Sequence, residues 1–285
     1  ARDVDVVHVQ HEPGIFGHAL APLLVRLRAS GARVVLDAHL LDDGVWRANR
    51  HVSDVVVAHS ETIAKAHPGA VYVPLAGPTP IPGSTAATVR HALGLPRAPT
   101  VGFFGFVSGH KGILQLVEAM GTVRALVPAH LVVVGDAHPT GDPMCAVRLA
   151  ELAATRPWIH WKRGFVEVHD ALRWRSACDV IALPYTAHSP SASGAARFAS
   201  AARRPVVVTA SSMFDGLDYV VRTSPEPGAL AKTIVDLLAD PMLLESAAAA
   251  SIVAAEEHSP RAVAARFVEV YEAALTAPPL ATFKA

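Results

Sequence analysis

A glycine-rich turn that carries a lysine is the strongest candidate for chemistry in this sequence. Residues 102–112 read Gly-Phe-Phe-Gly-Phe-Val-Ser-Gly-His-Lys-Gly and lead into a predicted helix that starts near Ile113. Backbone N–H groups in such a turn, the positive end of the helix dipole and the ammonium of Lys111 together suit a phosphate. The segment matches neither the P-loop nor the G-x-G-x-x-G pattern. A tight turn with a solvated lysine is the alternative interpretation.

A second turn between a predicted strand and a predicted helix has similar properties. Residues 183–194 read Leu-Pro-Tyr-Thr-Ala-His-Ser-Pro-Ser-Ala-Ser-Gly. Ser193 and Gly194 offer a hydroxyl and unhindered N–H groups to a further phosphate oxygen. The alternative is a helix N-cap that needs no ligand.

Histidines follow the ends of three predicted strands early in the chain, namely His11, His39 and His59. The carboxyl ends of parallel strands meet at one edge of a sheet, so three histidines there indicate a ligand site. Separate structural or solvated histidines are the alternative interpretation. Side chains alternate along a strand, so His8 and His11 point to opposite faces and are not expected to share a metal ion.

Composition excludes several classes of function. The 25 Lys and Arg balance the 25 Asp and Glu, so no net charge attracts a nucleic acid or an anionic membrane. Cys145 and Cys178 form no metal or disulfide pattern, which favours buried thiols in a reducing compartment and predicts a cytoplasmic protein. No apolar run approaches the ~18 residues that span a bilayer, and membrane association is not supported.

Short apolar runs alternate with longer amphipathic stretches, a pattern typical of parallel strands joined by crossover helices. Strands are predicted at residues 4–9, 32–37, 54–58, 70–73, 100–105, 130–135, 159–161, 179–183, 205–209 and 219–221. Helices are predicted at residues 19–29, from 113 onward, and at 241–256 and 260–275. The fold class is therefore α/β.

Six prolines between residues 74 and 99 interrupt this alternation and predict a linker. The predicted domains are an N-terminal Rossmann-like lobe at 1–82, a linker at 83–99, a C-terminal Rossmann-like lobe at 100–262, and a final helix and tail at 263–285. The first lobe has four predicted strands, fewer than the six of a full doubly wound sheet. We therefore expect it to be incomplete, with its missing units upstream of Ala1.

The order of these motifs resembles that of GT-B glycosyltransferases of family 4, the retaining group 1. The resemblance rests on His11-Glu12-Pro13, His39, the proline-rich segment, Gly105, Lys111-Gly112, Val134-Gly135-Asp136, Gly164-Phe165-Val166, Asp179-Val180, Leu183-Pro184-Tyr185, Ser193-Gly194 and residues 205–209. It implies two doubly wound lobes that face a cleft. It also implies a hexosyltransferase that moves a sugar from a nucleoside-diphosphate sugar, of the UDP or GDP type, to an acceptor hydroxyl. The transfer would retain the configuration of the anomeric carbon and would need no metal or other cofactor.

The resemblance also implies roles for particular residues. Lys111 would neutralise the departing diphosphate and His11 would contact the donor sugar, so these two are the expected catalytic residues. The expected donor contacts are Gly105, Phe106, Lys111, Gly164, Phe165, Val166, Tyr185, Ser191, Ser193 and Gly194. The expected acceptor-side residues are Glu12, Gly14, His39 and Ser60. No metal ligand is expected.

Two departures from the family pattern motivate other functions. The family's paired glutamates fall on Pro190 and Phe198, and Phe198 cannot grip a ribose diol as a carboxylate does. An arginine common in the family is Phe106 here. The alternative is therefore a catalytically silent GT-B protein that binds a nucleotide or serves as a partner subunit. A sugar-nucleotide epimerase is a third hypothesis, and it would need carboxylates in the cleft.

Overall fold

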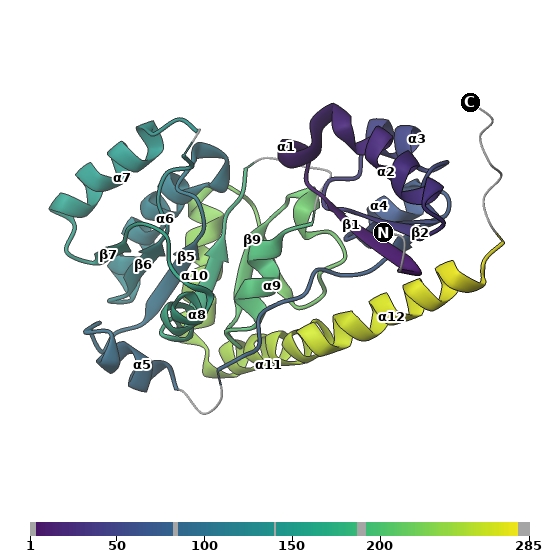
Figure 1. The fold of residues 1–285 in the computed structure, drawn as a ribbon. Coiled ribbons are helices and arrows are strands. Elements are labelled where there is room, and N and C mark those ends of the chain that lie inside the picture. Colours follow the sequence, from purple (N-terminus) through teal and green to yellow (C-terminus); the bar gives the residue numbers. More distant parts are fainter. Residues whose placement is uncertain (1–3, 82–84, 140, 187–191, 279–285) are drawn as a thin grey trace. The chain divides into compact units, whose positions relative to one another are not determined.

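The computed structural model describes residues 4–81, 85–139, 141–186 and 192–278. The described chain divides into two compact units, which we treat separately. Unit 1 combines residues 4–76 and 192 with residues 260–278 from the end of the chain, and unit 2 contains the described residues of 77–186 and 193–259. Figure 1 shows both units and the labels used below.

Unit 1 is built on a four-stranded parallel sheet in the order β1-β2-β3-β4. Its strands are β1 (Val6–His11), β2 (Arg33–Ala38), β3 (Val55–Ala58) and β4 (Ala70–Tyr72). Its helical segments are α1 (Pro13–Phe16), the 3-10 turn η1 (Gly17–Ala19), α2 (Leu20–Ala29), α3 (Asp43–Asn49), α4 (Glu61–Ala66) and α12 (Pro260–Thr276). All four strands run in the same direction, so their carboxyl ends meet at one edge.

Different helices cover the two faces of this sheet. Along β2, Val34 and Leu36 pack in a core with Leu24 of α2, whereas Val35 packs in a second core with Val270 of α12. Successive side chains of a strand point to opposite faces, so odd-numbered residues of β2 face α12. Asp37 therefore lies on the α12 face.

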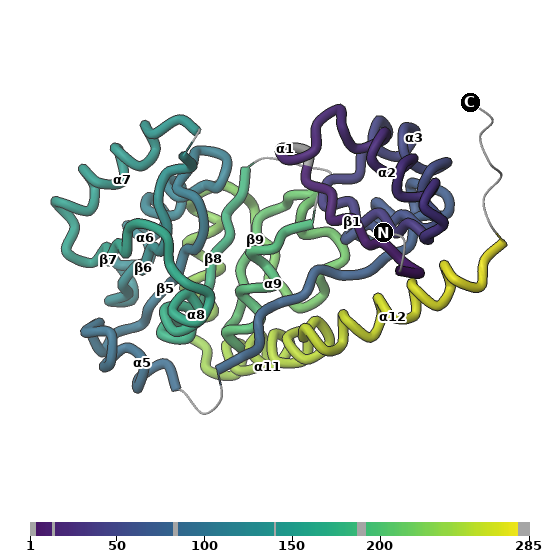
Figure 2. The backbone as a smooth tube through the Cα atoms, in the orientation of Figure 1, coloured from purple at the N-terminus to yellow at the C-terminus, as the bar shows by residue number. Residues whose placement is uncertain are grey.

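Unit 2 is built on a six-stranded parallel sheet in the order β10-β9-β8-β5-β6-β7. Its strands are β5 (Thr100–Phe104), β6 (His130–Val134), β7 (Ile159–Lys162), β8 (Val180–Leu183), β9 (Val206–Thr209) and β10 (Val220–Thr223). Counted from β5, this is the doubly wound order 3-2-1-4-5-6 of Rossmann sheets, and it reverses between β5 and β8. The tube in Figure 2 follows these strands side by side.

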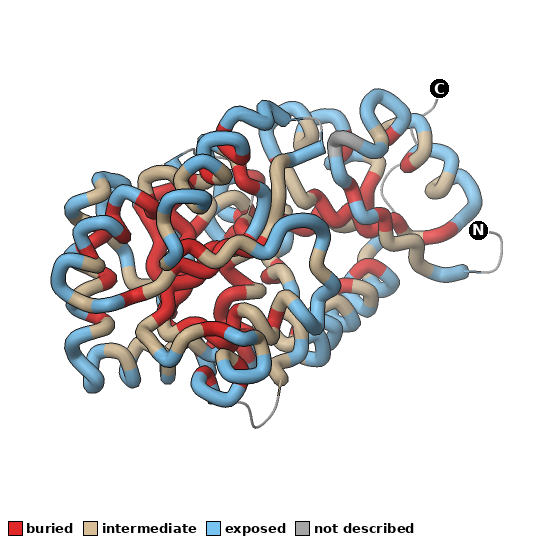
Figure 3. Tube along the Cα trace, turned by 90° about the vertical axis from the view of Figure 1, so that its left-hand side faces the viewer, coloured by how far each residue is buried: buried red, intermediate tan, exposed pale blue. Residues whose placement is uncertain are grey.

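Helices cover both faces of the second sheet. They are α5 (Ala86–Ala92), the 3-10 turn η2 (Gly109–Lys111), α6 (Ile113–Leu126), α7 (Met144–Thr155), α8 (Val168–Ser176), α9 (Gly194–Ser200), the 3-10 turn η3 (Ser212–Phe214), α10 (Pro227–Ala239) and α11 (Pro241–Glu257). Phe103 packs with α6 and α10 on one face, and Phe104 packs with α9 and α11 on the other. Figure 3 shows buried segments in the interior and exposed helix faces around them.

The predicted strands are confirmed, each within two residues of its observed ends. The two C-terminal helices, predicted at 241–256 and 260–275, are also confirmed. Cys145 and Cys178 are buried free thiols, as expected. No single helix among the described residues is long and apolar enough to cross a membrane; α10 and α11 meet that criterion only as a pair, with a bend of 100° between them.

The expected domain boundaries differ from the observed division in two places. The predicted linker at 83–99 contains α5, and Val89 of this helix is part of a unit 2 core. The terminal helix α12 belongs to unit 1, because Val263 and Val270 cover a sheet face of that unit. Prolines mark the ends of helices, but they do not show on which unit a short helix packs.

Candidate functional site

A pocket of about 550 Å³ lies at the carboxyl ends of β5, β6 and β7 in unit 2. It is lined by Phe104, Gly105, Phe106, Val134, Gly135, Asp136, Ala137, Pro139, Gly164, Phe165, Val166, Val168, Ala171, Arg175 and Phe198. Five expected donor-binding residues come together here, namely Gly105, Phe106, Gly164, Phe165 and Val166. Open α/β sheets bind their ligands at this edge.

A larger cavity of about 740 Å³ is the less suitable site. Ala98 and Pro99, which line it, directly precede β5, and Asp179 directly precedes β8. The cavity is thus at the amino ends of the strands. The carboxylate of Asp179 is already paired there with Arg90 Nη1 at 2.9 Å.

Glycines allow the loops at the carboxyl edge to approach one another. Gly135 has φ +133°, and a Cβ at this position would lie 2.0 Å from the carbonyl oxygen of Gly105. Gly112 has φ +70°, and its Cβ would lie 1.8 Å from the carbonyl oxygen of Pro184. No side chain fits at either position, so the glycine-rich turns of the sequence are required by close backbone packing.

Arg175 places a buried cation at the pocket. Its guanidinium lies 4.3 Å from the ring centre of Phe104 and 5.3 Å from that of Phe198. The side chain is buried, and its Nε and Nη1 atoms have no hydrogen-bond partner among the described residues. Burial lowers the pKa of Arg175 to about 10. Unsatisfied buried donors of a charged group are costly, so this arrangement favours an anionic ligand.

Sequence reasoning missed Arg175, although a local signal was present. Ala171, Leu172 and Arg175 are spaced i, i+1 and i+4 on α8, and Leu172 is buried. The arginine therefore occupies a position on the inward face of a helix, where an apolar residue is usual. A cation at such a position indicates either a buried partner or a ligand.

Lys111 lies in the turn before α6, with its ammonium 3.8 Å from the ring centre of Tyr185. Burial lowers the pKa of Lys111 to about 8, and burial raises the pKa of Tyr185 to about 12. The helix α6 begins after Gly112 with no side-chain cap and no acidic residue in its first turn. Its first N–H groups and the ammonium can therefore act together on an anion.

The structure places Ser193 and Gly194 at the start of α9. The Ser193 hydroxyl accepts a hydrogen bond from the Ala196 amide at 3.3 Å, and the Ser193 amide donates to the Met213 carbonyl at 3.3 Å. Ser193 thus caps α9, which was the alternative interpretation of this turn, and its hydroxyl and amide both have partners within unit 2. Gly194 is exposed. Ser191 and Pro190 lie outside the described residues.

His11, the expected contact of the donor sugar, and the expected acceptor-side residues lie at or after the strand ends of unit 1. His11 is buried at the end of β1 against Phe16, with ring centres 6.0 Å apart, and burial lowers its pKa. The His39 amide donates to the His11 carbonyl at 3.2 Å. Glu12 is exposed, and Gly14 lies in α1.

Ser60 has a structural role at the start of α4. Its hydroxyl accepts a hydrogen bond from the Ile63 amide at 3.4 Å and caps α4. Sequence reasoning missed Asp37 and Gln10, which contact the histidines of this edge. Asp37 was the available signal, because a carboxylate in an otherwise apolar strand needs partners.

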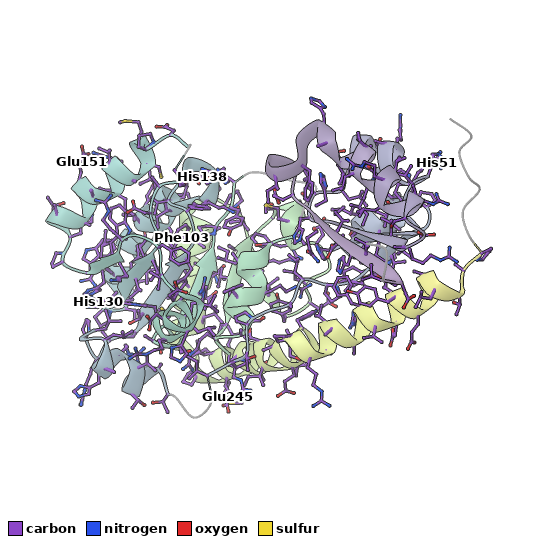
Figure 4. The ribbon with its side chains drawn as sticks, viewed as in Figure 1. His51, Phe103, His130, His138, Glu151 and Glu245 are labelled. Atoms are coloured by element: carbon purple, nitrogen blue, oxygen red, sulfur yellow. The ribbon has the colours of Figure 1, made fainter. Side chains whose placement is uncertain are left out.

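The side chains of unit 2 separate into buried and exposed groups. In Figure 4, Phe103 is labelled within the core of unit 2, whereas Glu151 on α7 and Glu245 on α11 project outward. His138, also labelled, packs edge-on against Phe106 with ring centres 4.6 Å apart. At the rim, Arg163 Nη2 pairs with Asp136 Oδ1 at 3.2 Å, and this pair lowers the pKa of Asp136.

This protein is similar to known proteins in its structure, but not detectably in its sequence. No protein-family model matches the chain, and no curated protein sequence matches it. Among solved structures, Anabaena Alr3699/HepE in complex with UDP has 18% identity and a TM-score of 0.78, over 95% of this chain and 79% of that chain.

Two further solved structures are similar. A sucrose-phosphate synthase from Thermosynechococcus elongatus has 18% identity and a TM-score of 0.72, over 94% of this chain and 73% of that chain. A glycosyltransferase from Rickettsia africae has 15% identity and a TM-score of 0.76, over 97% of this chain and 78% of that chain. The fold is therefore that of the GT-B glycosyltransferases, as the motif order predicted.

Proposed function

We propose that this protein is a glycosyltransferase that moves a sugar from a nucleoside diphosphate to an acceptor hydroxyl. The observation that carries the proposal is the unit 2 pocket, where five expected donor-binding residues line one cavity beside the buried cation of Arg175. The similar Anabaena structures contain UDP or UDP-glucose, which supports UDP as the nucleotide. Family 4 membership, retention of configuration and a cytoplasmic location are parts of the same proposal.

Lys111 is proposed to act on the leaving group. Negative charge on the departing diphosphate grows toward the transition state, so a fixed cation stabilises that state more than the bound donor. The ammonium is held over Tyr185 and is followed by the uncapped start of α6. These groups can supply the charge that a metal ion would otherwise provide, which is why we propose transfer without a metal at the diphosphate.

Arg175 is proposed to bind the donor and to compensate for a family departure. The family's arginine after Gly105 is Phe106 here, which lines the same pocket as Arg175. The guanidinium has free donors and no acidic partner among the described side chains. It can therefore donate charge-assisted hydrogen bonds to phosphate oxygens of the nucleotide. Gly164, Phe165 and Val166 are proposed to contact the base.

The remaining donor contacts are proposed at Tyr185, Ser191 and Gly194, and His11 is proposed to contact the donor sugar. Ser193 is proposed to act by holding the start of α9, because its own polar groups are engaged. Glu12, Gly14, His39 and Ser60 are proposed to shape the acceptor side. The acceptor is proposed to be a carbohydrate or another hydroxyl compound.

Nucleotide binding tests the proposal directly. Calorimetry with UDP, GDP and ADP is expected to show tightest binding of UDP. Lys111→Ala is expected to weaken it at least tenfold, about 1.4 kcal/mol. Lys232→Ala is the matched control, because that exposed lysine pairs with Asp236 on α10. Absence of binding by all three nucleotides at high micromolar concentration would contradict the proposal.

A catalytically silent nucleotide-binding protein is the second candidate, and Phe198 favours it. An aromatic ring lines the pocket at the position where the family carries a carboxylate for the ribose. Hydrolysis of UDP-sugars separates the two functions: an enzyme releases sugar slowly from the matching donor, whereas a silent protein binds UDP and releases none. Phe198→Glu is expected to tighten UDP binding in either case.

A further inference from the structure

Three side chains with metal-binding atoms meet at the carboxyl edge of the unit 1 sheet. Asp37 belongs to β2, His39 follows that strand, and His59 follows β3. Asp37 lies on the α12 face of β2, and the ring centres of His39 and His59 are 4.9 Å apart. One ligand atom from each of the three lies within 4.8 Å of the others. Asp37 and His59 are buried, and their side chains are 2% and 4% exposed.

The contacts of His59 show which of its two ring nitrogens carries a proton. Its Nδ1 lies 2.8 Å from the Val73 carbonyl oxygen, which can only accept, so Nδ1 carries the proton. In a neutral imidazole, Nε2 then presents a lone pair. That atom faces Asp37 Oδ1 at 2.7 Å, and neither atom has an aligned hydrogen-bond partner in the described chain. An imidazole nitrogen and a carboxylate oxygen at this distance share a proton, and the same two atoms are the ligands that a metal ion takes when it replaces that proton.

Neighbouring groups contact Asp37, His39 and His59 and fix the orientation of their side chains. The Nδ1–H···O=C contact of His59 is of the kind that orients metal-binding histidines. Gln10 Oε1 lies 2.7 Å from Nε2 of His39, and donation there leaves Nδ1 of His39 unprotonated. On the other side, Asp37 Oδ2 lies 3.3 Å from Nε2 of His8, whose Nδ1 contacts the Tyr271 hydroxyl at 2.7 Å.

We propose that Asp37, His39 and His59 form a mononuclear site for a divalent transition ion of the zinc class. Two imidazoles and one carboxylate suit Zn²⁺, and this ligand type does not suit Mg²⁺ or Ca²⁺. Ligand atoms around tetrahedral zinc are roughly 3.3 Å apart, so side-chain rotation has to separate His59 Nε2 and Asp37 Oδ1, which are 2.7 Å apart, and to close the wider gaps of up to 4.8 Å in the cluster. The fourth position is left for water or another oxygen ligand.

The ion would link the ends of β2 and β3 and satisfy the buried acceptors. No residue of this cluster lines the donor pocket of unit 2. The proposal therefore rests on other observations than the donor pocket and does not concern a metal at the diphosphate, although it shares His39 with the proposed acceptor side. A proton on His59 Nε2 is the competing cation, and metal binding distinguishes the two.

Equilibrium dialysis of the chelator-stripped protein against Zn²⁺, with metal analysis, tests the site. One Zn²⁺ per chain is expected, and Mg²⁺ is expected neither to bind there nor to compete. Co²⁺ substitution is expected to give the absorption of a four-coordinate ion. Saturating Zn²⁺ is expected to raise the Tm, because it binds the folded state.

Variants locate the bound ion. Outer-shell changes alone often cost about 10–100-fold in metal affinity, so His59→Gln and His39→Ala should each weaken Zn²⁺ binding at least about 100-fold. His39 is half-buried, so its variant keeps the fold even where His59→Gln does not. The control is His160→Gln, which removes one of two stacked histidines in unit 2 that have no carboxylate between them. Less than 0.2 Zn²⁺ per chain in the wild type, or loss of Zn²⁺ in the control alone, would overturn the proposal.

Discussion

Asp37 in unit 1 and Arg175 in unit 2 are both buried charged side chains, and their surroundings are opposite. In unit 1, the Asp37 carboxylate lies within 3.3 Å of His8 and 2.7 Å of His59. Burial alone would raise the pKa of Asp37, but these imidazoles hold it well below its usual value. In unit 2, Arg175 lies between aromatic rings, and burial lowers its pKa toward about 10.

The difference separates a charge that the chain compensates from one that it leaves to a ligand. The histidines around Asp37 belong to the same unit and supply donors or hold a small cation. Arg175 has no acidic partner among the described residues and lines an open pocket. Removing the first charge should harm the fold, whereas removing the second should harm binding.

The largest effect is expected for Asp37→Ala in the presence of EDTA. The free energy of unfolding should fall by about 3–5 kcal/mol, because His8 and His59 lose the buried carboxylate that they contact. Urea denaturation of wild type and variant measures it. Glu61→Gln, at an exposed pair with Lys65, should change stability by less than about 0.5 kcal/mol. A small effect of Asp37→Ala would show that the carboxylate is not compensated in the way we describe.

The second effect is expected for Arg175→Met, which should weaken UDP binding without lowering the stability of the protein. UDP binding should weaken roughly 10- to 100-fold, because a charge-assisted hydrogen bond contributes about 1.5–3 kcal/mol. Stability should stay equal or rise by about 1 kcal/mol, because an unpaired buried charge is replaced by an apolar side chain. Calorimetry and denaturation measure the two. Arg173→Met, on the same helix at an exposed pair with Asp170, should change neither.

Loss of stability in Arg175→Met with unchanged UDP binding would reverse this interpretation. The guanidinium would then support the packing of Phe104 and Phe198. Both Asp37 and Arg175 would then be charges that mainly support the fold.

The third effect concerns pH. Burial lowers the pKa of Lys111 to about 8, so its ammonium loses its charge as pH rises through that value. UDP affinity should therefore fall about tenfold between pH 7 and pH 9. Lys111→Arg should retain affinity at pH 9, because a guanidinium stays charged. Equal pH profiles in both proteins would exclude Lys111 as the titrating group.

The smallest effect is expected for Phe106→Arg, which restores the cation of the resembled family. Phe106 is about half exposed at the pocket, so a solvated arginine should tighten UDP binding only about two- to fivefold. The gain should be larger in Arg175→Met, where the pocket lacks its own cation. Equal gains in both backgrounds would show that the two positions act on different parts of the nucleotide.

Much of the fold followed from the sequence because its determinants are local. Apolar runs bounded by glycines and prolines predicted the strands, and the two C-terminal helices were predicted within one residue of their ends. The turn that holds Gly105 and Gly112 was recognised from its glycine content, and the structure gives both residues the positive φ angles that favour glycine. The loops after parallel strands must then meet at one edge, which placed the candidate site.

The tertiary structure decided which distant residues share a surface. His8 contacts Tyr271, 263 positions away, because α12 covers a face of the N-terminal sheet. Likewise, Arg175 reaches the pocket because α8 packs its inward face over Phe104. Neither contact has a periodic or local signature, because each depends on how a helix packs on a sheet formed elsewhere in the chain. The sequence thus determined the strands, the turns and the edge, and packing alone decided how each buried charge is compensated.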